Sequence, residues 1–476
     1  MISEREIKKV VEQVVAEVAA GRTAAAAAPA GGLGDGVYAD MEQAIAAAQQ
    51  AHAKYLAVGL QTRKKIVAAL RATALEHAES LGRQAVEETG LGKMPDKMLK
   101  IQLAANKTPG VEDVEPYAFS GDDGMTLVER APFGVVGVIT PSTNPAETVL
   151  NNGIGLLAAG NVAVYNFHPG AKKISARMVQ LMHRAIVAAG GPPDAVTCVA
   201  EPTQDSAAAL MRHRAIRMLL VTGGGEVVKL AMTSGKRCIC GGPGNPPVVV
   251  DESADIPAAA KHIVDGVTFD NNVLCIAEKE IFVVDEVADQ LIREMQKQGA
   301  QLLTASQTAN AVRAIIAKDP ADHGVRHPVV NKKFVGKSVA VIGQGIGVAP
   351  KPGTRMFLCE VKWDHVFVMA EQLMPLTPIV RCRDVDQAME YAIKAEQGNG
   401  HTFMMHSRNV ANLSRMAQRC NASIFVKNGP SYAGLGFGGE GFTTLTIASP
   451  TGDGLTRART FTRERRCVLK DYFRIV

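Results

Sequence analysis

The sequence predicts an α/β fold of two domains, each built on a parallel sheet, with a ligand site in the cleft between them. From Val135 onward, short apolar runs alternate with helical stretches, as in a sheet whose two faces are covered by helices. A second series of the same kind begins at Pro247 and continues through Val284. A chain of 476 residues is also longer than one hydrophobic core usually organises, so two or three domains are expected.

The elements can be placed in order from their apolar patterns. Residues 40–104 predict alanine-rich helices, and the alternation at 126–130 predicts a half-exposed strand. A buried strand follows, then a helix from about Ala146, and the strand–helix order continues into the second domain. The predicted helices cover 41–55, 63–87, 171–188 and 226–232, and the predicted strands cover 135–139, 161–165, 196–199, 218–221, 247–250 and 281–284.

The N-terminal segment has a pattern of its own. Apolar residues from Ile7 to Val18 recur at helical spacing, which predicts an amphipathic helix over 1–19. Residues 20–36, rich in alanine and glycine, predict a flexible linker. A tethered amphipathic helix suits docking on a partner, but the pattern fits an ordinary first helix packed on its own domain equally well. The four glutamates of the helix argue against a mitochondrial transit peptide.

Composition narrows the possible functions. A net charge of +5 is too small to indicate nucleic-acid binding, and no apolar stretch reaches membrane-spanning length. Eight cysteines with no regular spacing and no secretory signal are typical of a reducing cytosol. Cys238 and Cys240 form a single close pair best explained as core residues, and Gly324 and Pro328 argue against a helix that presents His323 and His327 to a metal. No metal site is therefore expected.

Cys275 is the candidate nucleophile. It follows the polar run Asp270-Asn271-Asn272, which predicts a loop leading into a helix that begins near the thiol. A helix N-terminus would lower the pKa of the thiol and increase its thiolate fraction. Most cysteines in such a chain only fill the core, so the local pattern alone leaves a packing role open.

Two further segments offer partners for such a thiol. Asn144 follows the strand at 135–139, at a sheet edge where ligand sites occur, and its amide could stabilise an oxyanion. An asparagine before a proline is also a common turn residue. The glycines at 223–225 lie between the strand at 218–221 and a helix, so their backbone could approach a pyrophosphate. A GxGxxG motif is absent from any suitable place, and the cluster alone is weak support.

Together these segments resemble the aldehyde dehydrogenase family over nearly the whole chain, from about residue 37. Residues 141–145 are similar to the family's asparagine motif, the loop at 222–226 to its shortened cofactor loop, and Cys275 to its nucleophile. The resemblance implies a Rossmann-type cofactor domain, an α/β catalytic domain and a small β element for oligomerisation. The implied parts are an encapsulation-type helix at 1–19, a linker at 20–36, the cofactor-binding domain at 37–245 with an oligomerisation strand near 126–134, the catalytic domain at 246–450 and a C-terminal oligomerisation segment at 451–476.

One departure from the family pattern determines the expected chemistry. Hydrolytic members carry a glutamate general base at the position that falls on or near Gly241 in this chain. Without a carboxylate to activate water, the resemblance implies that the thiol of coenzyme A accepts the acyl group. Residues 374–378 and 438–454 resemble the CoA-acylating branch of the family specifically.

The resemblance therefore implies an enzyme that oxidises a short-chain aldehyde to an acyl-CoA, with propanal as the expected substrate and acetaldehyde as the alternative. It implies NAD as cofactor, although no residue separates NAD from NADP, and coenzyme A as co-substrate. Cys275 would form a thiohemiacetal and then a thioester, while Asn144 and the Cys275 N–H hold the oxyanion. The acid for the nicotinamide ribose is expected near Gln372, with Glu371 beside it. Residues expected at the cofactor are Thr140, Pro141, Ser142, Thr222, Gly223, Gly224, Gly225 and Pro375.

The implied partners are a second copy of the chain and a shell protein. Strands near 126–130 and 467–473 are expected to form the sheet of a homodimer or homotetramer. The helix and linker resemble the encapsulation peptides of bacterial microcompartment enzymes, which implies a place in the lumen of such a compartment and a shell partner for residues 1–19. Three alternatives stay open: a hydrolytic aldehyde dehydrogenase, a cysteine acyltransferase or hydrolase with a histidine partner, and a non-catalytic shell-binding protein.

Overall fold

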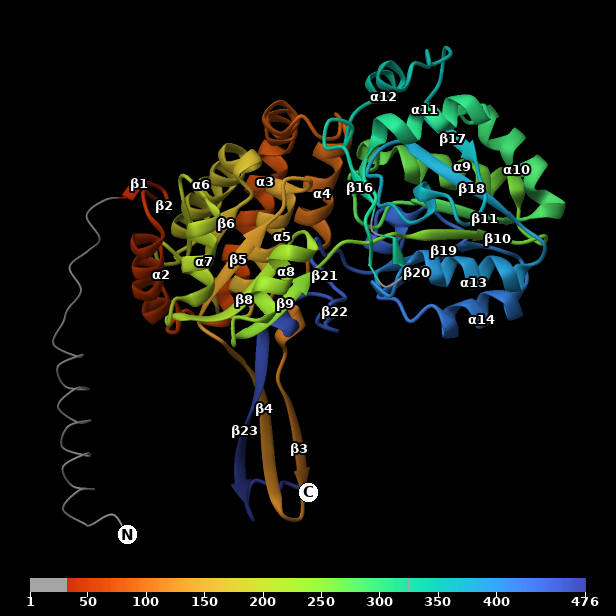
Figure 1. Ribbon diagram of the computed structural model, residues 1–476. Coiled ribbons are helices and arrows are strands. Elements are labelled where there is room, and N and C mark those ends of the chain that lie inside the picture. The colour runs from red at the N-terminus through yellow and green to blue at the C-terminus, as the bar shows by residue number, and fades with distance from the viewer. Residues whose placement is uncertain (1–31, 323–324, 327) are drawn as a thin grey trace, which may run out of the picture.

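The computed structural model describes residues 32–322, 325–326 and 328–476. Two α/β domains lie side by side, and a long arm of strands projects from the first (Figure 1). The predicted helix over 1–19, most of the predicted linker, and His323 and His327 lie outside the described residues. Residues 32–34, near the end of the predicted linker, form a strand that pairs with the next one.

The first domain is built on a seven-stranded sheet. Its neighbouring strands are parallel except for the first pair, and its order reverses between the two strands that start at Val135 and Ile216. At such a reversal the segments that follow the two strands leave the sheet in opposite directions, which opens a crevice at the carboxyl ends of the strands. The order is β1 (Gly32–Gly34), β2 (Val37–Tyr38), β7 (Val196–Val199), β6 (Val162–Phe167), β5 (Val135–Thr140), β8 (Ile216–Thr222) and β9 (Arg237–Gly241).

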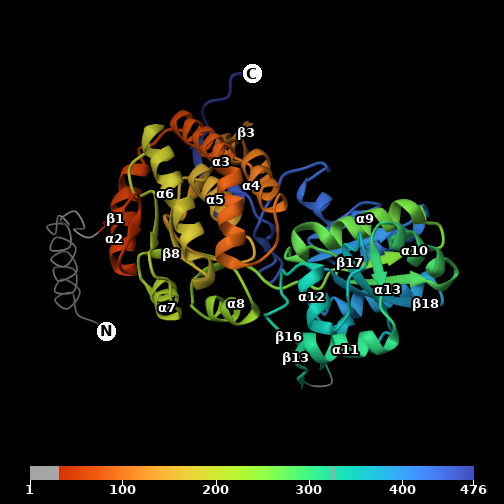
Figure 2. The same cartoon turned by 90° about the horizontal axis from the view of Figure 1, so that it is seen from above.

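Helices cover both faces of this sheet, and one of them is buried along its whole length. That helix, α5 (Pro145–Ala158), contacts three other helices and the sheet, which explains why it consists mostly of small and apolar residues. The helix that starts at Asp96 lies on the side that faces the second domain (Figure 2). The remaining helices are α2 (Met41–Tyr55), α3 (Leu60–Thr89), α4 (Asp96–Lys107), α6 (Lys172–Ala188), α7 (Gln204–Arg212) and α8 (Gly225–Met232).

The second domain also contains a seven-stranded sheet, and every neighbouring pair in it is parallel. The order is β12 (Ala300–Leu302), β17 (Met356–Glu360), β18 (Leu376–Cys382), β11 (Glu280–Val284), β10 (Pro247–Val250), β19 (Thr402–His406) and β20 (Ile424–Lys427). Its helices are α9 (Ile256–Thr268), α10 (Asp285–Lys297), α11 (Ala305–Ile315), α12 (Val339–Ile346), α13 (Val385–Ala395) and α14 (Val410–Arg419). The predicted α/β fold with two parallel sheets is therefore confirmed.

The arm is a three-stranded antiparallel sheet of β3 (Tyr117–Gly121), β4 (Gly124–Pro132) and β23 (Thr462–Lys470). Cys467 pairs with Leu127 and Val468 with Thr126, so the predicted sheet of segments 126–130 and 467–473 is confirmed, with pairing up to Lys470. Apolar side chains such as Phe119 and Val468 are exposed on the arm. An exposed apolar face of this kind commonly marks a contact with another chain.

The segment that precedes β23 returns to the first domain. The Leu445 N–H donates to Asn151 Oδ1 of α5 at 3.0 Å, and Phe461 is buried in the first domain's core. The first domain is thus completed by residues more than 200 positions after β9. The short elements are β13 (Ile316–Lys318), β14 (Ala321–Asp322), β15 (Val325–Arg326), β16 (Val329–Val330), β21 (Ile447–Ala448), β22 (Gly454–Leu455), η1 (Val111–Val114), η2 (Pro169–Ala171), η3 (Phe269–Asn272), η4 (Val366–Val368), η5 (Ser431–Leu435) and η6 (Ala458–Phe461).

Two properties of the described part of the chain bear on function. No helix in it combines the length and the apolar composition needed to cross a bilayer. The same residues contain no group of three histidines, cysteines or acids arranged to hold a metal ion. Cys238 and Cys240 lie on β9, where Cys240 is buried and Cys238 partly so.

Candidate active site

The segment that carries Cys275 is buried except at the cysteine itself. Every other residue from Asp270 to Val284 is buried, whereas Cys275 is partly exposed. The three residues Asp270, Asn271 and Asn272 all adopt left-handed backbone conformations, with φ of 48°, 52° and 64°. Aspartate and asparagine tolerate this region better than other non-glycine residues because their short side chains hydrogen-bond locally. The polar run therefore serves to turn the chain so that the next exposed side chain is the thiol.

Hydrogen bonds from these side chains fix the turn. Asn271 Nδ2 donates to the carbonyl oxygens of Gly92 and Gly336 at 3.1 and 3.0 Å. Asn272 Oδ1 accepts from Lys279 Nζ at 2.7 Å. The same ammonium, fully buried, also donates to the Leu274 and Ala277 carbonyl oxygens at 3.1 Å each. Lys279 thus anchors the backbone on both sides of Cys275.

The prediction of a helix that begins near Cys275 is wrong. Residues 273–279 form turns and irregular structure, and β11 begins at Glu280. Without a helix N-terminus, burial and then the charge of Glu371 raise the pKa of the Cys275 thiol, to about 12 in all. The positive charge of Lys279 and the N–H groups of Cys275 and Ile276 oppose that rise. The resting thiol is therefore protonated at neutral pH.

Asn144 lies in the first domain, immediately after β5 and before α5. It is 5% exposed, and its side chain does not cap the helix that it precedes. Instead, Lys100 Nζ donates to Asn144 Oδ1 at 2.6 Å, and Asn144 Nδ2 donates to Thr143 Oγ1 at 3.3 Å. The amide hydrogens are thus left only weakly used by the protein, as an oxyanion donor requires.

A buried cluster of four charges lies at the boundary between the domains. Lys97 and Lys100 come from α4, Glu147 from α5, and Asp270 from the segment that leads to Cys275; all are at most 2% exposed in their side chains. Asp270 Oδ2 lies 3.0 Å from Lys97 Nζ and 2.5 Å from Lys100 Nζ, and Glu147 Oε1 lies 2.9 Å from Lys100 Nζ. The positive and negative charges balance, which is the condition under which buried ions are tolerated.

The glycine loop offers free backbone at the crevice of the first sheet. A Cβ built on Gly224 or Gly225 meets nothing within 4 Å, and both residues are exposed at the start of α8. Thr222, at the end of β8, hydrogen-bonds through its hydroxyl to the Thr446 hydroxyl at 2.7 Å. Open glycine backbone at a helix N-terminus fits the pyrophosphate of a dinucleotide. The expected contacts at the end of the neighbouring β5 are a buried Thr140 and partly exposed Pro141 and Ser142.

The acid whose charge acts on Cys275 is Glu371, next to the expected position at Gln372. Gln372 is fully buried and donates to the Phe367 carbonyl oxygen. Glu371 is partly exposed, its carboxylate accepts from the Gly244 N–H at 3.4 Å, and its charge acts on both Cys275 and Lys279. Desolvation raises the pKa of Glu371. Pro375, the other expected cofactor residue in this region, is buried directly before β18.

His401 is a neighbour of the site that the sequence pattern did not indicate. Gly244 lies between Cys275 and His401. A Cβ built on it would lie 2.8 Å from the Cys275 carbonyl oxygen and 3.0 Å from the His401 ring, so only a glycine fits between the two residues without a shift. His401 is 1% exposed, and burial lowers its pKa to about 4, which keeps the ring neutral. Its Nδ1 lies 2.9 Å from the Thr402 hydroxyl. The only sequence signal was its place directly before a buried strand.

An enclosed apolar pocket adjoins the nucleophile segment at Leu274. Its aromatic wall is a cluster of Phe269, Tyr432 and Phe437, whose ring centroids lie 5.2 to 5.6 Å apart. The pocket has a volume of about 10 Å³, room for one group the size of water or methyl. Its remaining lining is Leu99, Lys100, Leu103, Leu435 and Leu445. The pocket therefore admits no group larger than a methyl unless this wall moves.

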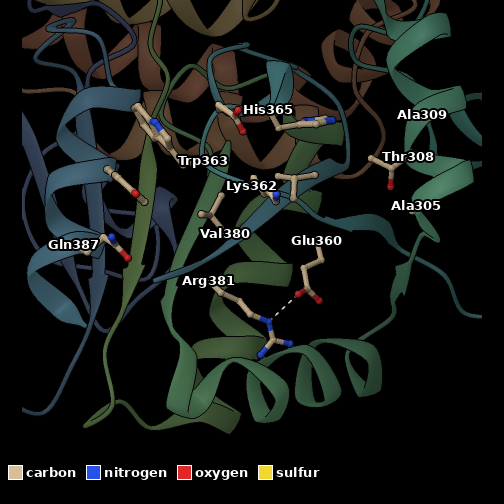
Figure 3. A pocket seen from close by; sticks show the side chains of 13 residues that line it. Ala305, Thr308, Ala309, Glu360, Lys362, Trp363, His365, Val380, Arg381 and Gln387 are labelled. Atoms are coloured by element: carbon tan, nitrogen blue, oxygen red, sulfur yellow. Dashed lines mark hydrogen bonds and ion pairs between the residues drawn. The ribbon is translucent and has the colours of Figure 1, made fainter. Parts of the chain in front are cut away.

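A separate cavity lies at the other end of the second sheet. It measures about 760 Å³ and adjoins the carboxyl ends of β17 and β18, where Glu360 and Arg381 are paired at 2.7 Å (Figure 3). Trp363 and Tyr391, both in its lining, stack at 4.7 Å. Cys275, Glu371 and His401 all lie before the amino ends of β11, β18 and β19, so this cavity is separate from the candidate site.

Comparison with known proteins agrees with this arrangement. The model of the aldehyde dehydrogenase family matches residues 22–446. The acetylating acetaldehyde dehydrogenase EutE of Escherichia coli is 45% identical over 476 residues, with full coverage of both chains. A propionaldehyde dehydrogenase from a fucose utilisation microcompartment of Clostridium phytofermentans has a TM-score of 0.89 and 46% identity, covering 93% of this chain and 100% of that one. A propionaldehyde dehydrogenase of Rhodopseudomonas palustris, solved with bound CoA and an acylated cysteine, has a TM-score of 0.88 and 44% identity over 92% of this chain and 99% of its own.

Proposed function

The chain belongs to the aldehyde dehydrogenase family, and we propose that it is a CoA-acylating member that oxidises a short-chain aldehyde, propanal above all, to the acyl-CoA. The observation that carries this proposal is the nucleophile segment, which exposes one thiol from a buried turn. The absence of a carboxylate at Gly241 and the similarity to an enzyme solved with CoA and an acylated cysteine favour CoA over water as acyl acceptor. The similarity to two propionaldehyde dehydrogenases favours propanal among short aldehydes.

In the first step, Cys275 Sγ would add as a thiolate to the aldehyde carbon, so that a C–S bond forms and the carbonyl electrons move onto oxygen. Asn144 Nδ2 and the Cys275 N–H are the donors available to the oxyanion. The thiol must first lose its proton, because its pKa is raised to about 12 by burial. Lys279 stabilises the thiolate through its positive charge.

The crevice between β5 and β8 fits NAD. Gly224 and Gly225 leave their backbone open at the start of α8, with Gly223 directly before them, and Pro141, Ser142 and Thr222 border the same edge, so these residues would hold the dinucleotide. Bound NAD supplies a two-electron acceptor for the hydride that leaves the aldehyde carbon. The protein's part is to keep that carbon, attached to Cys275, beside the crevice.

The last step returns the nucleophile. The thiol of coenzyme A would attack the thioester carbon as a thiolate, the acyl group passes to its sulfur, and Cys275 leaves as a thiolate. Since CoA enters after the redox step, the kinetics are expected to be ping-pong. Gly241 lies against the backbone of Ile447, at 3.1 Å from a built Cβ, so this position offers neither a base nor much room for one.

We also propose the assembly and place of the protein. The division into a cofactor-binding domain at 37–245, a catalytic domain at 246–450 and an oligomerisation segment at 451–476 is supported by the two sheets and the arm, with the modification that 443–448 pack on the first domain. Exposed apolar residues on the arm support a homodimer or homotetramer. Similarity to a microcompartment enzyme supports a place in such a lumen, with residues 1–19 as the contact to the shell.

The test is NADH formation from propanal with and without CoA, for wild type and Cys275→Ala, with the product identified by mass spectrometry. We expect sustained turnover only with CoA, propanoyl-CoA as product, and none with the variant. Cys467→Ala, at an exposed cysteine of the arm, is the matched control and should behave as wild type. Sustained turnover without CoA would move the protein to the hydrolytic branch, with Glu371 as the available base. A higher kcat/KM for ethanal than for propanal would make acetaldehyde the main substrate.

A further inference from the structure

We propose that Lys100 is a positioning residue that orients the amide of Asn144 and fixes it relative to the nucleophile segment across the domain boundary. The inference rests on the proposed function, in which Asn144 serves as an oxyanion donor. It assigns a role in the reaction to a side chain that lies on α4, far in sequence from both Asn144 and Cys275.

The chemistry of an ammonium group sets the orientation of the amide. A lysine ammonium can only donate hydrogen bonds, whereas an asparagine side chain has one accepting and one donating end. Lys100 Nζ lies 2.6 Å from Asn144 Oδ1, so the Nδ2 end must point the other way. The other bond of this amide, at 3.3 Å to the Thr143 hydroxyl, does not select an orientation, because a hydroxyl accepts or donates equally well.

The backbone around Asn144 gives no alternative means of holding the amide. Asn144 precedes α5, where its side chain could have capped the helix, but it makes no such bond. Lys97 holds the neighbouring backbone instead, by donating to the Thr143 carbonyl oxygen. Among the bonds described, only the one from Lys100 distinguishes the two ends of the amide.

The same ammonium reaches the other domain. Asp270 Oδ2 lies 2.5 Å from Lys100 Nζ, and Asp270 begins the left-handed turn that ends at Cys275. Two more bonds join Asp270 to the first domain: its Oδ1 accepts from the Lys93 N–H at 2.9 Å, and its N–H donates to Asp96 Oδ2 at 2.7 Å. Asn144 and Cys275 belong to different domains, and Lys100 contacts the segments of both.

Two consequences for the reaction follow from this geometry. Because Lys100 contacts both Asn144 and Asp270, it holds the oxyanion donor and the nucleophile segment in a fixed relative position when one domain shifts against the other. The positive charge at Oδ1 also polarises the amide, which strengthens the hydrogen bond that Nδ2 donates to a developing oxyanion. Removal of Lys100 should therefore slow acylation without changing the reactivity of the thiol itself.

The test variant is designed to keep the buried charges balanced. Lys100→Met combined with Glu147→Gln leaves Lys97 paired with Asp270, and the single variant Glu147→Gln is the matched control that retains the bond to Asn144. Acyl-enzyme formation is followed as the pre-steady-state burst of NADH. We expect a loss of about 10- to 100-fold in the burst rate for the double variant, part of the 10²- to 10³-fold that loss of a whole oxyanion donor costs. The control should lose less than about threefold.

A double-mutant cycle with Asn144→Ala separates positioning from a general structural effect. If Lys100 acts through the amide, the Lys100→Met change should cost less than about threefold once Asn144 is absent. Alkylation of Cys275 by iodoacetamide, followed by peptide mass spectrometry, needs no oxyanion donor and should proceed at the wild-type rate. If Lys100→Met does not fold, the same cycle is run with Lys100→Gln, which keeps a hydrogen-bond donor without charge and should lose less of the burst rate.

Several results would overturn the inference. Additive losses in the cycle would show that Lys100 acts independently of Asn144. A parallel fall in the alkylation rate would place its effect on the thiol. An unchanged burst rate in the double variant would exclude any role in acylation. A wild-type protein that forms no NADH from aldehydes would reject the proposed function itself, which is distinguishable from failure of the cycle in an active enzyme.

Discussion

The two seven-stranded sheets present opposite edges to the candidate site. In the first domain, Asn144 and the glycine loop follow β5 and β8, so the sheet contributes its carboxyl edge. In the second domain, Cys275, Glu371 and His401 precede β11, β18 and β19, so the sheet contributes its amino edge. The carboxyl edge of the second sheet borders the 760 Å³ cavity, which holds none of these groups.

The two edges supply different parts of the chemistry. A carboxyl edge carries helix N-termini and open backbone, which suit an anionic ligand that binds and is released in each cycle. The amino edge of the second sheet instead holds a buried turn, locked by Lys279 and by asparagine side chains. That edge is suited to hold one reactive side chain still, whereas the first domain supplies the binding surface.

The first sheet would act on the reacting oxygen through Asn144, and loss of this side chain should slow the reaction most. Asn144→Ala should lower the burst rate of NADH formation by about 10²- to 10³-fold, because one oxyanion donor is lost. The rate of Cys275 alkylation should stay unchanged, since the second domain keeps its turn. A fall in both rates would mean that the two edges do not act separately.

The glycine loop provides the next test. Gly224→Ala should fold normally, since φ is −67° and a Cβ meets nothing within 4 Å, yet the methyl group would stand where a dinucleotide approaches. We expect the KM for NAD to rise about tenfold, equivalent to about 1.4 kcal/mol. Gly59→Ala is the matched control, because Gly59 also precedes a helix and has open space around its Cβ position. Equal KM values in the two variants would remove the loop from the cofactor site.

The amino edge should show a pH dependence of stability. Burial raises the pKa of Glu278 from 4.5 to about 7, so the folded protein binds this proton more tightly than the unfolded chain. Stability from this group is therefore lost as pH rises from 4.5 to 7, by about 1.4 kcal/mol per unit, and is constant above that window. Glu278→Gln removes the loss and should gain stability relative to wild type between pH 5 and 7. Urea unfolding, followed by the fluorescence of Trp363, the chain's one tryptophan, measures the free energy of unfolding of the second domain at each pH. If this free energy changes with pH by the same amount in wild type and in Glu278→Gln, the assignment is contradicted.

The smallest effect is expected at the unused edge. Lys362→Ala changes an exposed residue that lines the 760 Å³ cavity. It should alter kcat/KM for propanal by less than twofold, because the site lies at the opposite end of the same strands. A larger change would show that the carboxyl edge of the second sheet also serves the reaction.

The contrast between the edges also explains what the sequence could predict. Asn144 and residues 222–225 follow apolar strands, and a polar or glycine-rich turn after such a run is a recognisable signal of a sheet-edge site. Glu371 and His401 precede strands, where polar residues have no comparable signal. The motif predicts Cys275 as the nucleophile, but the helix expected after it is wrong, because the left-handed turn depends on side-chain bonds to Gly92 and Gly336.

The residues next to Lys100 in the sequence do not predict its burial or its role at the site. Lys97 and Lys100 are ordinary charged residues of a predicted helix, where lysines usually face solvent. Their burial depends on Asp270 and Glu147, which lie 170 and 47 positions away from Lys100 and meet it only in the folded chain. The fold class followed from the strand–helix alternation because that pattern is local. The charge cluster is a product of tertiary structure.

Completion of the first domain by residues 443–461 has a consequence for synthesis of the protein. Ribosomes add about 5 to 20 residues per second, so roughly 10 to 40 s separate the emergence of β9 from that of Phe461. During this interval the nascent first domain lacks Leu445, Ala458 and Phe461, which later fill its core. The second sheet, whose strands lie between Pro247 and Lys427, can fold in the meantime. The first domain therefore depends for its completion on the last part of the chain to be made, whereas the second sheet does not.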